Sequence, residues 1–129
     1  MKQPYRILLT EDDRDIRELV FELLKGEDFD CVQASDGLEA KQILEKEKFD
    51  LLITDLRMPR MDGVELLEWC RQSKIHFPVI FISANTELLP KEQLALEDCC
   101  AAIINKPMDM DSILRAIAEA KTRNHLLHC

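Results

Sequence analysis

Four short apolar segments of this chain are each followed by a residue that could take part in phosphoryl-transfer chemistry. Glu11 and Asp12 follow residues 6–10, Asp55 follows residues 51–54, Ser83 follows residues 79–82, and Lys106 follows residues 101–105. A carboxylate such as Asp55 can act as a nucleophile toward phosphorus. Phosphoryl transfer otherwise needs positioning and positive charge, which Lys106 would supply to a phosphoryl oxygen while Ser83 donates a hydroxyl hydrogen bond.

The three acids in this set predict a cation. Three carboxylates within a few ångströms repel one another, so at least one of their pKa values must rise. A hard divalent cation removes this conflict, and Mg²⁺ suits one or two carboxylates together with water and a phosphate. We therefore expect Glu11, Asp12 and Asp55 to form a Mg²⁺ site.

The elements that must position these residues follow from the apolar pattern. Short apolar runs are typical of buried strands, which we expect at 6–10, 29–34, 49–54, 78–82 and 101–105. Apolar residues at helical spacing predict helices between them: one that follows residue 13 and ends at Gly26, one over about 37–46, one that follows Asp62, one over about 90–97, and one that follows Asp109 or Asp111. Asp13, Asp36, Asp62 and either Asp109 or Asp111 are expected to cap four of these helices.

Alternating strands and helices predict an α/β fold with parallel strands joined by right-handed crossovers. We expect one doubly wound sheet of the flavodoxin-like (βα)5 type with strand order 2-1-3-4-5, because its continuously apolar strands suit a sheet covered on both faces. All strands then end at one edge, where the five polar side chains would meet. We expect residues 1–129 to form a single domain with its core over about 5–121 and a tail over 122–129.

Composition limits the classes of function. The chain has 129 residues, 47% of them apolar, and a net charge of −8, which argues against direct nucleic acid binding. The longest apolar run, 99–104, is too short to span a membrane, and the first residues do not resemble a signal peptide. Five cysteines without a C-x-x-C spacing indicate free thiols in a reducing compartment, so we expect a cytoplasmic protein.

The segment from Asp55 to Gly63, Asp-Leu-Arg-Met-Pro-Arg-Met-Asp-Gly, resembles the phosphoacceptor loop of response-regulator receiver domains. The resemblance extends over about residues 5–121. It implies that Asp55 accepts a phosphoryl group from a histidine kinase or a histidine phosphotransfer protein. It also implies that Mg²⁺ or Mn²⁺ binds to Glu11, Asp12, Asp55 and the backbone carbonyl of Arg57. Such a domain is a phosphoacceptor that assists its own chemistry and is not a turnover enzyme.

The same resemblance implies a switch with an output surface. Phosphorylation would draw in Ser83 and Lys106 and change the face formed by the predicted elements 90–97, 101–105 and 111–120, where an unidentified partner binds. A dimer formed through this face on phosphorylation is a further hypothesis. The family often has a cis peptide bond at the position of Lys106-Pro107, which we therefore expect here as well.

Two departures from the family keep an alternative open. Ile103 occupies a position that is often aromatic in the family, and Cys99-Cys100 replaces a frequent Gly-Ala. A receiver-like interaction module that works without phosphorylation is therefore the alternative function. A haloacid-dehalogenase-type phosphatase would need an aspartate where Arg57 stands. A flavodoxin would place its flavin phosphate against Glu11-Asp12-Asp13, which would repel it.

Overall fold

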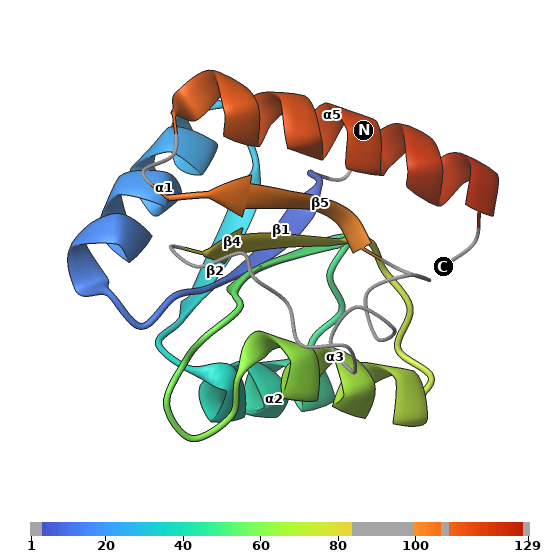
Figure 1. Ribbon diagram of the computed structural model, residues 1–129. Coiled ribbons are helices and arrows are strands. Elements are labelled where there is room, and N and C mark those ends of the chain that lie inside the picture. Colours follow the sequence, from blue (N-terminus) through green and yellow to red (C-terminus); the bar gives the residue numbers. More distant parts are fainter. Residues whose placement is uncertain (1–3, 84–99, 107–108, 128–129) are drawn as a thin grey trace.

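The computed structural model describes residues 4–83, 100–106 and 109–127, and within them a five-stranded parallel sheet of order β2-β1-β3-β4-β5 (Figure 1). The strands are β1 (Arg6–Thr10), β2 (Asp30–Ala34), β3 (Leu51–Asp55), β4 (Val79–Ser83) and β5 (Cys100–Asn105). The helices are α1 (Arg14–Gly26), α2 (Gly37–Lys46), α3 (Gly63–Gln72) and α5 (Met110–Leu127). The predicted fold class and strand order are confirmed, while the helix expected at 90–97 lies outside the described residues.

Helices α1 and α5 cover one face of the sheet, and α2 and α3 cover the other (Figure 1). Successive strand residues point to opposite faces. On β1, therefore, Ile7 and Leu9 pack with α1 and α5, while Leu8 packs with α2 and α3. The central strands β1, β3 and β4 are buried on both faces, which is why they are almost continuously apolar, whereas β2 at the side of the sheet is largely half-buried and contains Asp30 and Gln33.

The helix starts are fixed by the predicted aspartates. Asp13 accepts hydrogen bonds from the backbone N–H groups of Asp15 and Ile16, and Asp36 accepts one from Glu39. At α3, Asp62 and Glu65 form a complete capping box, in which each side chain accepts from the backbone N–H of the other. Of the two candidates at α5, Asp109 is the cap, because its Oδ1 accepts the backbone N–H of Ser112 at 2.7 Å. These contacts satisfy donors that a helix start otherwise leaves without partners.

Two helix ends differ in detail from expectation. α1 ends at Gly26 as predicted, but the left-handed residue that follows the helix is Asp28, with φ 64°, and the glycine itself is not left-handed. An aspartate tolerates this conformation better than most side chains. α5 continues to Leu127, so residues 122–127 of the predicted tail are helical.

The strand register brings the carboxyl ends of the strands together. Thr10 of β1 lies beside Thr54 of β3, Asp55 lies beside Ile82 of β4, and Ser83 lies beside Asn105 of β5. Glu11, Asp55, Ser83 and Lys106 are therefore at one edge of the sheet, as the topology predicted.

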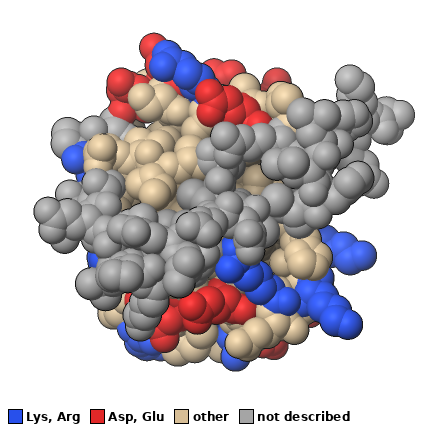
Figure 2. All heavy atoms as spheres, turned by 45° about the vertical axis from the view of Figure 1, so that its right-hand side comes forward, with Lys and Arg blue, Asp and Glu red and all other residues tan. Residues whose placement is uncertain are grey.

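The described surface carries both signs of charge. On the face shown in Figure 2, basic and acidic side chains lie near one another among the described residues, and neither sign covers the face alone. None of the described helices combines the length and the apolar composition that a bilayer-spanning helix requires.

Gly63, the first residue of α3, allows this helix to begin directly against β3. A Cβ atom there would lie 2.5 Å from the carbonyl oxygen of Asp55 and 2.9 Å from a ring carbon of Phe81. We expect Gly63→Ala to lower the free energy of unfolding by about 1–3 kcal/mol through overpacking. Urea denaturation followed by circular dichroism measures this change.

Gly26→Ala is the matched control, because nothing lies within 4 Å of a Cβ built at Gly26. Replacing a helical glycine by alanine should raise stability by up to about 1 kcal/mol. Equal effects of the two substitutions would contradict the close packing of α3 against β3.

Candidate functional site

Three carboxylates meet at the carboxyl edge of the sheet. Glu11, Asp12 and Asp55 each offer an oxygen that lies within 4.8 Å of the other two. Glu11 is 3% exposed and Asp55 is 6% exposed, while Asp12 is exposed to solvent. Hard oxygen ligands in such a cluster, with access from solvent on one side, fit Mg²⁺ or a similar divalent cation.

Lys106 places its ammonium between two of these carboxylates. Its Nζ lies 2.7 Å from Glu11 Oε1 and 2.9 Å from Asp55 Oδ2. Burial disfavours the ammonium, but the hydrogen bonds to Glu11 and Asp55 outweigh it and raise the pKa of Lys106. The lysine is therefore held charged at the centre of the site, and β5 is connected to both β1 and β3.

Glu11 is the carboxylate that this environment perturbs most clearly. Burial raises its pKa from 4.5 to about 7, because the bond from Lys106 does not compensate for desolvation and for the nearby charge of Asp55. A glutamate whose pKa is raised by burial and by a neighbouring carboxylate is typical of functional sites.

The main chain at the end of β1 is held by a residue that sequence reasoning did not single out. Arg17, on the first turn of α1, donates from its guanidinium to the carbonyl oxygen of Glu11 at 2.8 Å. The Asp13 N–H donates to Glu11 Oε2 at 3.3 Å. A basic residue one turn after an acidic strand end is a weak signal, but it could have identified Arg17.

The loop from Leu56 to Asp62 sets the position of Asp55. The backbone N–H of Arg57 donates to Asp55 Oδ1 at 3.2 Å, and Gly63 N–H donates to the carbonyl oxygen of Leu56 at 3.1 Å. The first bond holds the main chain of Arg57, the predicted backbone ligand, beside the carboxylate. The second closes the loop at its base.

Ser83 is brought to the same edge. It is 2% exposed at the end of β4, and its carbonyl oxygen accepts the backbone N–H of Lys106 at 2.9 Å. Ile103, at the position that is often aromatic in receiver domains, is 38% exposed on β5. Cys99 and Pro107 lie outside the described residues, so the expected Lys106-Pro107 geometry stays a prediction.

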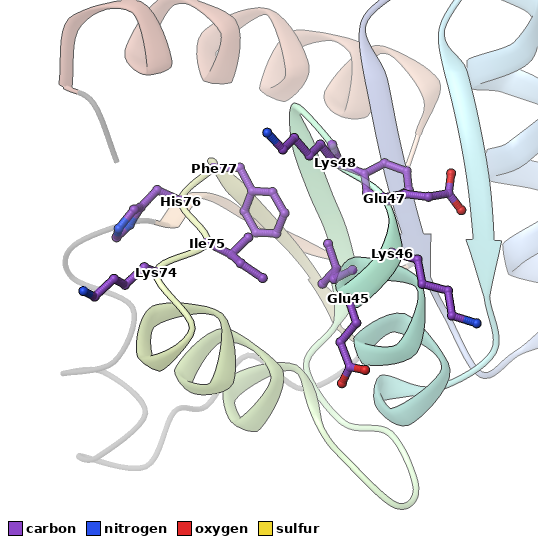
Figure 3. A pocket seen from close by; sticks show the side chains of 10 residues that line it. Glu45, Lys46, Glu47, Lys48, Lys74, Ile75, His76 and Phe77 are labelled. Carbon is purple, nitrogen blue, oxygen red and sulfur yellow. The ribbon is translucent and has the colours of Figure 1, made fainter.

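A hollow of about 380 Å³ lies at the opposite edge of the sheet (Figure 3). It is lined by the end of α2 and by the loops that lead into β3 and β4, including Phe49, Ile75 and Phe77. None of the predicted site residues lines it, and the acidic cluster is at the other end of the strands.

Comparison of the sequence with known families agrees with this arrangement. The family model described as "Response regulator receiver domain" matches residues 7–118. The transcriptional regulatory protein GlrR of Escherichia coli K12 is 33% identical over 118 residues, which are 92% of this chain and 26% of GlrR. The sensor histidine kinase RcsC of the same strain is 33% identical over 112 residues, which are 86% of this chain and 12% of RcsC. The chain thus spans about a quarter or less of the length of these relatives.

Solved structures share the fold. The signal receiver domain of a putative LuxO repressor protein from Vibrio parahaemolyticus has a TM-score of 0.83 and 28% identity, covering 96% of this chain and 95% of that one. A response regulator receiver domain protein from Clostridium thermocellum has a TM-score of 0.83 and 26% identity, covering 95% and 98%.

The pKa of Glu11 predicts how stability depends on pH. The folded protein binds the Glu11 proton up to about pH 7, whereas the ordinary pKa is 4.5, so stability falls as the pH rises between these values. Glu11→Gln removes this loss while its amide oxygen can still accept from Lys106. We therefore expect the free energy of unfolding of Glu11→Gln, relative to that of the wild type, to rise by on the order of 2 kcal/mol as the pH increases from 4.5 to 7.5.

Urea denaturation in EDTA at several pH values measures this difference, and the histidines common to both proteins cancel in it. A difference between Glu11→Gln and the wild type that does not change with pH would contradict the raised pKa of Glu11.

Proposed function

The chain belongs to the response regulator receiver domain family, and from this premise we propose that Asp55 is its phosphoacceptor. It is a two-component signalling domain, a phosphoacceptor and not a turnover enzyme, and its acidic pocket of Glu11, Asp12 and Asp55 is typical of a phosphoacceptor site. The observation that carries the proposal is the contact of buried Asp55 with the half-buried Lys106 at the edge where the acids converge.

In this reaction an oxygen of Asp55 attacks the phosphorus of a phosphohistidine. The new bond joins the carboxylate oxygen to phosphorus, and the bond from phosphorus to the donor nitrogen breaks, so that the imidazole leaves with the electron pair. Asp55 is suited to this role because its carboxylate is held from two sides, by Arg57 N–H on Oδ1 and by Lys106 Nζ on Oδ2. Such positioning lowers the entropic part of the barrier.

Lys106 and Ser83 would act on the product. The ammonium that now bonds to Asp55 Oδ2 lies where it can pair with a phosphoryl oxygen on Asp55. Ser83 is connected to it through the bond between Lys106 N–H and the Ser83 carbonyl. A shift of the lysine toward the phosphoryl group would therefore displace the ends of both β4 and β5. This displacement would couple phosphorylation to a change in structure.

A divalent cation would be held by Glu11, Asp12, Asp55 and the backbone carbonyl of Arg57. When bound, Mg²⁺ or Mn²⁺ neutralises the charge that accumulates when a phosphoryl group approaches the acids. The proposal is supported by the excess of acid in the cluster: among the described residues it holds three carboxylates, two of which contact the ammonium of Lys106.

Membership in the family implies a histidine kinase as the partner. We propose that a histidine kinase or a histidine phosphotransfer protein is the donor and that the reaction takes place in the cytoplasm. The output would be carried by the face of β5 and α5, where Ile103 is 38% exposed and Met110 is 54% exposed. A domain core over about 5–121, and dimerisation through this face on phosphorylation, belong to the same proposal.

The test is phosphorylation by acetyl phosphate or phosphoramidate, with and without Mg²⁺, followed by intact-mass measurement. We expect one phosphoryl adduct that requires Mg²⁺ and that Asp55→Asn abolishes, because the amide is not a nucleophile toward phosphorus. Asp62→Asn is the matched control from the same loop, since asparagine keeps the helix cap. It should be phosphorylated like the wild type.

An adduct on Asp55→Asn would show that another residue is the acceptor. Failure of the wild type to take up phosphate from both small donors and from a phosphorylated histidine kinase would favour the interaction module that works without phosphorylation.

A further inference from the structure

The loop that carries Asp55 is attached to a neighbouring helix at a point outside the acidic cluster. Arg60 lies near the tip of this loop, and its Nε donates to Asp36 Oδ2 at 3.0 Å, while an Nη of the same guanidinium also contacts that oxygen. The other oxygen, Oδ1, accepts the backbone N–H of Glu39 at 2.9 Å. Asp36 is 6% exposed, so one buried carboxylate both caps α2 and holds the loop.

The backbone of Arg60 is in a conformation that glycine adopts more easily. Its φ is 69°, in the left-handed region where a Cβ atom is unfavourable. What arginine adds at this position is a side chain that reaches Asp36. A residue in a strained backbone conformation whose side chain contacts a buried carboxylate is an observation from which a functional role can be argued.

A second contact lies beside the first. A Cβ atom on Gly37, the first residue of α2, would overlap the carbonyl oxygen of Met61. The Met61 side chain packs against the core between α2, α3 and the sheet. The loop tip is therefore held against the start of α2 at two consecutive residues, Arg60 and Met61.

The base of the loop transmits this attachment to the site. The Gly63 N–H bond to the Leu56 carbonyl keeps the loop short and closed, and only Met58 and Pro59 separate Arg60 at its tip from Arg57 at its base. The N–H of Arg57 donates to Asp55 Oδ1. The attachment at Asp36 therefore constrains the main chain that borders the acceptor carboxylate.

We propose that the contact of Arg60 with Asp36, together with Met61 on Gly37, is a clamp that positions Asp55 and the main chain of Arg57 for cation binding and phosphoryl transfer. Arg60 is then a positioning residue. The inference rests on the proposed function of Asp55, and it adds α2 to the elements that determine the activity of the site.

A clamp and an ordinary surface ion pair differ in the properties that change when the contact is removed. The Asp36 side chain is only 8% exposed, but the Arg60 side chain is 60% exposed, so water screens the pair, and screened ion pairs contribute little to stability. Loss of the contact should therefore have a small effect on the melting temperature and a larger one at Asp55. A purely structural role would change the two together.

The experiment compares Arg60→Gly, Asp36→Asn and the double variant by calorimetric Mg²⁺ titration and by the phosphorylation rate at a fixed donor concentration. Glycine suits the left-handed backbone, and asparagine still caps α2. We expect either substitution to raise the Mg²⁺ dissociation constant by roughly threefold to tenfold, within the range by which residues that do not touch a ligand change its binding. The double variant should show no greater effect than one substitution, because both remove the same contact.

Lys74→Gly is the matched control. Lys74 also has a left-handed backbone, with φ 60°, and it lies between α3 and β4 at the opposite edge of the sheet (Figure 3). Like Arg60→Gly, this substitution removes one positive charge and places glycine in a left-handed backbone conformation. We expect its Mg²⁺ dissociation constant and phosphorylation rate to equal those of the wild type.

A metal-free readout separates this inference from the proposed function. In EDTA, the NMR amide signal of Arg57 should move in Arg60→Gly and stay in place in Lys74→Gly. If the wild type takes up no phosphoryl group, the proposed function is contradicted but the clamp is not, because the Arg57 amide signal still tests the clamp. An unchanged Arg57 signal, or Mg²⁺ binding by Arg60→Gly equal to that of Lys74→Gly, would overturn the clamp.

Discussion

The ammonium of Lys106 between the carboxylates of Glu11 and Asp55 is the interaction on which the site depends. Lys106 follows β5, Glu11 follows β1 and Asp55 ends β3, so this contact joins three strands at one edge. All three side chains are largely buried, where removal of one partner leaves an uncompensated charge. The same contact makes the edge responsive, because a ligand on Asp55 competes directly for the lysine.

The rest of the described structure keeps this edge in place without neutralising it. At the opposite edge, Arg6 is paired with Asp30 and Glu47, and it also donates to the carbonyl of Lys48. Its guanidinium lies 4.6 Å from the centre of the Phe49 ring. The charge of Arg6 is thus paired within the protein. At the carboxyl edge the three acids of the cluster outnumber the ammonium of Lys106, an excess of negative charge that a divalent cation would balance.

Close backbone packing at two glycines fixes the positions of the elements that carry the charged residues. Gly63 lets α3 begin against the carbonyl of Asp55, and Gly37 lets the loop tip rest on the start of α2. Neither glycine has a positive φ, so each is required for space and not for backbone conformation. Residues that do adopt left-handed conformations, Asp28, Arg60 and Lys74, lie in connections between elements.

The sequence by itself determined the order of elements, the caps at Asp13, Asp36 and Asp62, and the convergence of Glu11, Asp12, Asp55, Ser83 and Lys106 on one edge. It could do so because apolar periodicity is a local signal and because parallel strands joined by crossovers must end together. The resemblance to receiver domains supplied the roles of these residues. The extent of α5 to Leu127 was missed, since helix ends are weakly encoded in sequence.

Only the tertiary structure decided which pairs of charges are in contact. That Lys106 bridges Glu11 and Asp55, that Arg17 holds the Glu11 carbonyl and that Arg60 reaches Asp36 depends on distances between segments far apart in the chain. Burial likewise raises the pKa of Glu11 to about 7, a value that composition and spacing could not give. Electrostatic interactions vary with distance and with local solvent exposure, and both are fixed only when the strands and helices have packed.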